Sequence, residues 1–190
     1  HATLTSRSGT PVSARPAEFP NSFTDSLTPG VPVRTVVAVR SLLIDNYDSY
    51  TYNLFQLMAG TFGVRPTVLT NDALDRDLID PRDFDAVVIS PGPGRPQNPA
   101  DVGGCLDLLL DWRLPVLGVC MGHQILAVAS GADVVAAPVP RHGFLERVRH
   151  DGQGLFRGIP QGFTAVRYHS LCVGEPLPDG IARIALGRID

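Results

Sequence analysis

The chain has 190 residues, and its 19 acidic side chains against 16 basic ones give a formal net charge of −3. A mildly acidic chain without a basic cluster lacks the electrostatic footprint for nucleic acid or an anionic membrane, so we expect neither as a partner. No apolar run approaches the roughly 20 residues that would cross a bilayer. The length and the 44% hydrophobic composition fit one globular domain with a sizeable core.

The first 32 residues differ from the rest of the chain in composition and periodicity. Residues 1–32 are rich in Pro, Ser and Thr and show neither a strand period nor a helix period. They also lack the layout of a signal peptide. We expect residues 1–39 to be a disordered leader or a remnant of expression, and residues 40–190 to be the folded domain.

Strand and helix patterns alternate after this leader. Repeated β–helix–β units with apolar strands predict an α/β fold: an open, twisted, mostly parallel sheet with helices on both faces. Short alternating segments after Gly131 predict an antiparallel extension of that sheet. The expected strands are 41–45, 65–70, 85–90 and 114–119, and the expected helices are 50–62, Asp101 to about Trp112, and 121–130.

Polar or glycine-rich motifs follow three of the expected strands. They are "DNYDS" (45–49), "SPGPGRPQN" (90–98) and "CMGHQ" (120–124). Ligands of open parallel sheets bind beyond the carboxyl ends of the strands. The three motifs therefore predict a binding site at this edge.

Cys120 stands between a predicted strand and a predicted helix, flanked by Gly118 and Gly122. This is the layout of a nucleophile elbow with Cys in place of Ser. The helix N-terminus is expected to lower the thiol pKa. The N–H of Met121 and an N–H of the "PGPG" turn (91–94) could then hold a developing oxyanion, each contributing about 3 kcal/mol.

The cysteines could also have purely structural roles. Cys120 could be a small buried hydrophobe, as we expect for Cys105 and Cys172. An odd number of cysteines in a chain of this size predicts free thiols and a reducing, cytoplasmic compartment.

Structural and functional roles also compete for four of the five histidines. His123 is expected to pack or hydrogen-bond locally, and His169 to face a ligand or make a structural hydrogen bond. His142 and His150 are expected at the surface. No pair of His or Cys has ligand spacing, so we predict no metal and no cofactor.

Four motifs in order give the sequence a family resemblance: "LLIDNYDSYTYNL", "VVISPGPGRPQNPADVG", "PVLGVCMGHQILA" and "RYHSL". Over residues 40–190 the chain resembles the class I, triad-type glutamine amidotransferases, in the branch that serves chorismate-using enzymes. The resemblance implies that Cys120 attacks the side-chain amide of L-glutamine, forming a thioester, and that ammonia passes to a chorismate-binding synthase subunit or fused domain. It implies Gly92 and Met121 as oxyanion donors and, as contacts to glutamine, Gly92, Pro93, Gly94, Gln124, Ser170 and Leu171.

Within this branch, the "HGFLE" segment (142–146) is more similar to aminodeoxychorismate synthases of the 4-aminobenzoate and folate route. The amidotransferase component of anthranilate synthase, on the tryptophan route, remains the alternative. The family's catalytic His and Glu follow "RYHSL" in an "FHPES"-type motif, which does not occur before Asp190, and His169 is not that histidine. We therefore expect a C-terminally incomplete domain that turns over glutamine poorly by itself.

Two other functions are compatible with the motifs. A silent amidotransferase would serve only to dock on a synthase. A flavodoxin-like protein would use "PGPGRP" as a phosphate loop, although the loop lacks the lysine and spacing of a P-loop.

Overall fold

The computed structural model describes residues 38–187 except 76, 78, 112 and 184. The expectation for the leader (1–39) therefore lies almost entirely outside the described residues, as does the expected helix end at Trp112. None of the described helices is long and apolar enough to cross a membrane.

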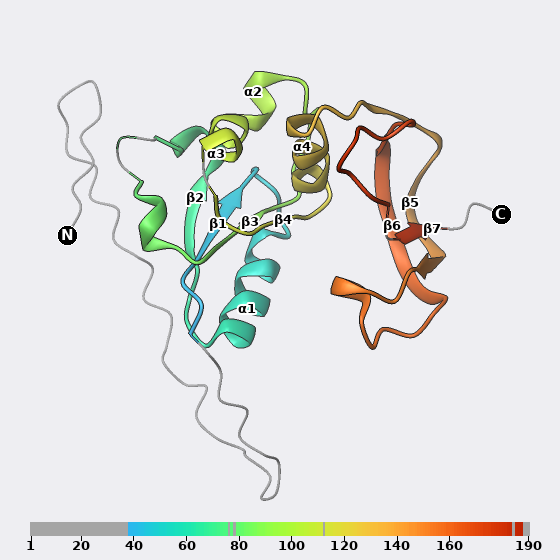
Figure 1. Cartoon of the computed structure of the whole chain (residues 1–190), viewed down its shortest axis with the longest axis horizontal. Helices are drawn as coiled ribbons and strands as arrows, with labels where there is room; N and C mark the ends of the chain where they lie inside the picture. Colours follow the sequence, from blue (N-terminus) through green and yellow to red (C-terminus); the bar gives the residue numbers. More distant parts are fainter. Residues whose placement is uncertain (1–37, 76, 78, 112, 184, 188–190) are drawn as a thin grey trace, which may run out of the picture. The chain divides into compact units, whose positions relative to one another are not determined.

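Four parallel strands form the central sheet, in the order β2-β1-β3-β4 (Figure 1). In its register Ile44 pairs with Ile89, and Ile89 pairs with Gly118, so the three strands end at one edge. The predicted parallel sheet is confirmed: the strand at 41–45 has the expected bounds, and the other three are slightly shorter than expected. They are β1 (Ser41–Asp45), β2 (Thr67–Thr70), β3 (Ala86–Ile89) and β4 (Val116–Gly118).

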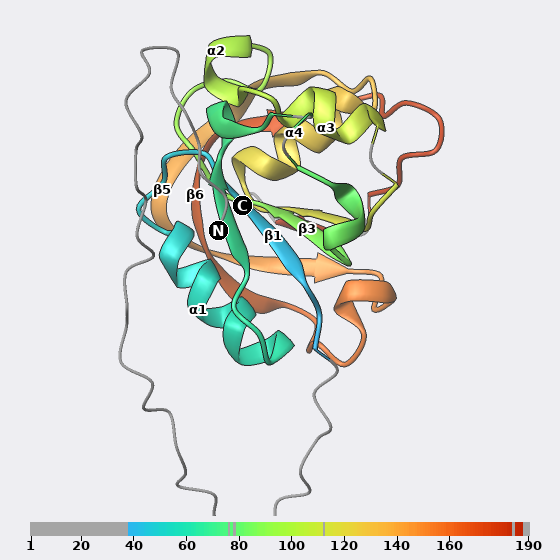
Figure 2. The same cartoon turned by 90° about the vertical axis from the view of Figure 1, so that its left-hand side faces the viewer.

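Helices cover both faces of this sheet, as Figure 2 shows for α1 and α3 on either side of β1 and β3. Because successive side chains alternate along a strand, Leu43 packs with Met58 of α1, whereas Ile44 packs with Cys105 of α3 and Ile125 of α4. The fully buried Cys105 confirms its expected core role. The helices are α1 (Thr51–Phe62), α2 (Pro99–Val102), α3 (Cys105–Asp111) and α4 (Met121–Ala129).

The expected helix that begins at Asp101 is instead two short helices. The side chain of Asn98, not Asp101, caps α2 by accepting a hydrogen bond from the N–H of Ala100. The chain then leaves the helix at Gly103, with φ +51°, where a Cβ atom would lie 2.3 Å from the carbonyl oxygen of Asn71. Glycine is needed there both for the backbone angle and for the close approach.

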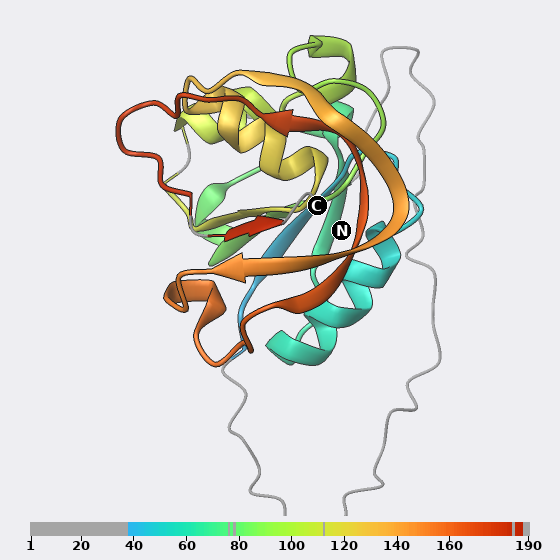
Figure 3. The ribbon, with the colours of Figure 1, turned by 90° about the vertical axis from the view of Figure 1, so that its right-hand side faces the viewer.

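The antiparallel strands are present, but they form a second sheet in the order β6-β5-β7 rather than extending the first (Figure 3). The first of the short segments expected after Gly131 merge into one long strand over 134–150, whose register shifts between Ala136 and Arg141 and again near Gly143. Pro138 and Pro140 lie in the first irregular stretch and have no N–H to donate. The strands are β5 (Val134–His150), β6 (Phe163–Val173) and β7 (Ala185–Gly187).

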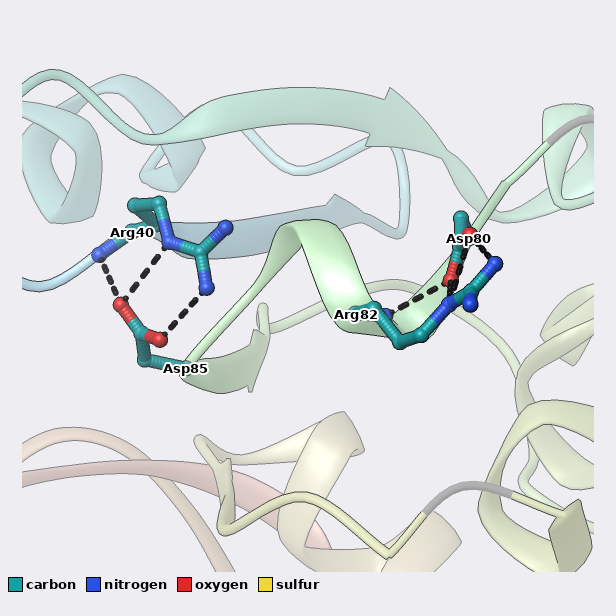
Figure 4. Close-up of polar contacts among 4 residues, drawn as sticks. All are labelled: Arg40, Asp80, Arg82 and Asp85. Atoms are coloured by element: carbon teal, nitrogen blue, oxygen red, sulfur yellow. Dashed lines mark hydrogen bonds and ion pairs between the residues drawn. The ribbon is translucent and has the colours of Figure 1, made fainter.

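Short 3₁₀ turns and exposed ion pairs lie in the connections between these elements, and Figure 4 shows two of the pairs. Arg40 and Asp85 join the segments that enter β1 and β3, with 2.8 Å between Nη2 and Oδ1. Arg82 donates to Asp80, whose pKa falls to about 2 because of this hydrogen bond. Exposed pairs of this kind contribute little to stability. The 3₁₀ turns are η1 (Asn71–Ala73), η2 (Pro81–Asp83) and η3 (Gly154–Phe156).

Candidate active site

The three predicted motifs meet at the carboxyl edge of the parallel sheet. The N–H of Ser90 donates to the carbonyl of Ile44, and the N–H of Val119 donates to the carbonyl of Ile89. These bonds continue the strand ladder one residue past β3 and β4. The "DNYDS" segment, the "PGPG" turn and Cys120 thus emerge from neighbouring strands.

Cys120 occupies the turn between β4 and α4 in an unusual backbone conformation. Its φ is +52° and its ψ is −105°, and it lies at the N-cap of α4. A residue with a Cβ atom at positive φ carries steric strain of about 1–2 kcal/mol. Such strain is typical of functional sites, where the surrounding structure holds it in place.

The two flanking glycines make room for this turn rather than supplying its backbone angle. A Cβ atom on Gly122 would lie 2.2 Å from the carbonyl oxygen of Ile89 in β3. A Cβ atom on Gly118 would lie 2.4 Å from the carbonyl group of Gly122. The start of α4 therefore presses directly on β3 and β4, which fixes where Cys120 leaves the sheet.

The thiol of Cys120 belongs to an exposed residue and is not part of the core. Neighbouring atoms nevertheless exclude some of its water, and this desolvation raises the pKa of Cys120. The N–H of Met121 opposes the shift, and the charge of Asp48 adds to it. The expected lowering of the pKa by the helix N-terminus is therefore wrong: burial and a facing carboxylate outweigh the single N–H contact.

A raised pKa has a measurable consequence for alkylation of Cys120. The rate with iodoacetamide should rise with pH beyond the midpoint of an ordinary thiol, because only the thiolate reacts. Asp48→Asn should move the curve to lower pH by removing the facing charge. Asp83→Asn, in η2, serves as the control and should leave the curve in place. A plateau already reached at neutral pH in the unmodified chain would contradict the assignment.

The "PGPG" turn has one face against the "DNYDS" segment and one against α2. A Cβ atom on Gly92 would lie 2.5 Å from Cβ of Asn46, and one on Gly94, whose φ is +92°, would lie 2.3 Å from the carboxylate of Asp101. Pro93 and Gly94 are exposed at the tip. Only glycine therefore fits at positions 92 and 94, on either side of Pro93.

Strand β6 reaches α4 through Gln124. The buried Gln124 side chain donates from Nε2 to the carbonyl of Leu171 at 3.5 Å, and Nδ1 of His169 donates to the same carbonyl at 2.7 Å. Leu171 is half-buried and Ser170 is exposed. The bond made by His169 is the structural one that the sequence left open, and it leaves Nε2 of that ring as the acceptor in its neutral form.

The structure places some of the histidines and cysteines as expected and others differently. Desolvation and the neighbouring His169 lower the pKa of His123, an exposed residue of α4. His142 is exposed as expected, but His150 is half-buried and stacks on Phe156 with ring centroids 4.8 Å apart. Cys172, expected in the core, is only half-buried.

The "DNYDS" motif was expected at the site, but its Asn46 and Asp48 were not singled out, and Asn71 was missed. Asn46 and Asn71 are 2% and 3% exposed. An asparagine that directly follows an apolar strand, as both do, is the signal that could have marked them, because a buried amide requires partners. Within the described residues, no cluster of His, Cys, Asp and Glu could hold a metal ion.

The fold and this strained cysteine fit one class of proteins, and the sequence matches the family "Glutamine amidotransferase class-I" over residues 42–187. The chain belongs to this family. It is 54% identical to the aminodeoxychorismate synthase of Streptomyces pristinaespiralis over 72% of its own length and 19% of that protein. It is 45% identical to anthranilate synthase component 2 of Thermus thermophilus, over 72% of this chain and 66% of that one.

The solved structure of a glutamine amidotransferase from Thermotoga maritima has the same fold, with a TM-score of 0.61 and 19% identity over 77% of this chain and 66% of that one. The chain spans only about a fifth of the length of the aminodeoxychorismate synthases that it matches. Homology is therefore shown for the amidotransferase portion of those proteins.

Proposed function

We propose that this domain is a glutaminase module whose nucleophile is Cys120. The observation that carries the proposal is the positive φ of Cys120 at the N-terminus of α4. Cys120 follows β4, which pairs with β3, the strand that leads into the "PGPG" turn. The strained turn at Cys120 exposes the thiol at the edge where ligands of parallel sheets bind. Membership of the amidotransferase family supports the same chemistry.

In the proposed reaction, the sulfur of Cys120 forms a bond to the side-chain carbonyl carbon of L-glutamine. The N–H groups of Met121 and Gly92 hold the oxyanion of the tetrahedral intermediate. Collapse of the intermediate breaks the C–N bond, and the thiol proton leaves on ammonia. Water then cleaves the thioester and restores the thiol. We assign Pro93, Gly94, Gln124, Ser170 and Leu171 as further contacts to glutamine.

The ammonia is proposed to pass to a chorismate-binding synthase, either a subunit or a fused domain. The relatives favour the product 4-amino-4-deoxychorismate, because identity is 54% and 50% to aminodeoxychorismate synthases and 45% to anthranilate synthase component 2. Transfer of ammonia to an anthranilate synthase, on the tryptophan route, remains the alternative. Free thiols at Cys105, Cys120 and Cys172 fit a reducing, cytoplasmic location.

Glutamate release from L-glutamine tests the proposal. In the full-length gene product, Cys120→Ser should lower the rate by at least about 10³-fold, because serine lacks a thiolate. Cys172→Ser, at the other partly accessible thiol, should leave the rate unchanged. Equal rates for Cys120→Ser and the unmodified protein would refute the role of Cys120. No release from a correctly folded unmodified protein would favour the silent docking module.

A further inference from the structure

A buried polar network joins the two ends of the "PGPG" turn. At its entry, the N–H of Asn46 donates to Oγ of Ser90 at 2.9 Å, and Nδ2 of Asn46 donates to the carbonyl of Ser90 at 2.9 Å. Oγ of Ser90 in turn donates to the carbonyl of Pro91 at 2.7 Å. Gly92 also packs closely against Asn46, so Asn46 supports the first half of the turn.

The exit of the turn is held by Asp101 of α2. Its carboxylate accepts a hydrogen bond from the N–H of Arg95 at 2.8 Å and fills the space beside Gly94. Asp101 thus fixes the residues that follow the tip, whereas Asn46 fixes those that precede it.

Asn71, which follows β2, connects these two supports. Its Nδ2 donates to Oδ1 of Asn46 at 3.0 Å and to the carbonyl of Asp101 at 2.8 Å, so both amide hydrogens are used. The carbonyl of Asn71 accepts the N–H of Gly104 at 2.9 Å.

From this geometry we infer that Asn71 is a positioning residue for glutamine hydrolysis: with Asn46 it holds the "PGPG" turn where the N–H of Gly92 can meet the oxyanion. The inference rests on the proposed function. An oxyanion exists only near the transition state, so loss of the Gly92 N–H should lower kcat. Pro93 and Gly94 of the same turn are assigned as glutamine contacts, so KM should also rise, but by a smaller factor. The nucleophile itself, held by α4 and β4, should keep its reactivity.

The test compares Asn71→Ala with Met58→Ala in the full-length gene product. Met58 is 5% exposed in α1, on the other face of the sheet, so its truncation destabilises the core without touching the network. We expect Asn71→Ala to lower kcat for glutamine about 10- to 100-fold, since a displacement near 1 Å can cost that much. The KM should change far less, and alkylation of Cys120 by iodoacetamide should be retained.

Hydrogen exchange provides a readout that does not depend on activity. The amides of Asn46 and Arg95, bonded to Ser90 and Asp101, should exchange faster in Asn71→Ala than in Met58→Ala. If Asn71→Ala does not fold, the milder Asn71→Ser replaces it. Variants of Asn71 that match Met58→Ala in kcat and in exchange would overturn the inference. An unmodified protein without glutaminase activity would refute the proposed function and, with it, a role of Asn71 in hydrolysis, whereas exchange would still show whether Asn71 holds the turn.

Discussion

Gly122→Ala should destabilise the domain by about 3 kcal/mol, near the upper end of the usual cost of overpacking. The added Cβ atom would lie 2.2 Å from the carbonyl oxygen and 2.8 Å from the carbonyl carbon of Ile89. Both are backbone atoms of a central strand, so neither can rotate away as a flexible side chain would. Relief requires α4 to move off β3, and this movement would also displace Cys120.

Urea unfolding followed by circular dichroism measures this effect, with Gly60→Ala as the matched control. Gly60 lies in the exposed part of α1, and nothing lies within 4 Å of a Cβ atom added there. Alanine should stabilise that helix by up to about 1 kcal/mol. Equal free energies of unfolding for Gly122→Ala and Gly60→Ala would contradict the predicted clash between α4 and β3.

Gly92→Ala should lower glutamine turnover about 100-fold while the fold survives, because misplacement of a catalytic group by about 1 Å can have this effect. The added Cβ atom would lie 2.5 Å from Cβ and 2.8 Å from the carbonyl oxygen of Asn46. Asn46 is held by its own hydrogen bonds to Ser90, so the turn must yield. The N–H of Gly92 would then miss the oxyanion.

Steady-state kinetics with L-glutamine and alkylation with iodoacetamide separate the two parts of this expectation. Turnover should fall, whereas the rate of alkylation of Cys120 should stay near that of the unmodified protein. Gly60→Ala again controls for the added methyl group. Normal turnover by Gly92→Ala would remove Gly92 from the proposed oxyanion site.

The parallel sheet and the meeting of the three motifs at its carboxyl edge followed from local sequence. Apolar strands such as 41–45 and 85–90 alternate with amphipathic helices, and this pattern depends mainly on neighbours in the chain. The second sheet was harder to predict. Pro138 and Pro140 interrupt the pattern of β5, although the strand continues through them with a shift in register.

The electrostatics of the site depended on distant residues. A helix N-terminus alone favours a thiolate, yet the pKa of Cys120 is raised by desolvation and by Asp48, which lies far earlier in the chain. Similarly, Asn71 and Asp101 come together only because β2 and α2 are neighbours in the fold. Contacts between side chains so distant in sequence leave no local pattern.

The most direct test of the account is to trap the acyl group on the enzyme. The full-length gene product is mixed with L-glutamine, quenched in acid within the first turnover, digested and analysed by mass spectrometry. We predict that the peptide containing Cys120 gains the mass of one glutamyl group, and that this gain is absent in Cys120→Ser. A glutamyl group found on another residue, or glutamine hydrolysis that persists in Cys120→Ser, would contradict the account.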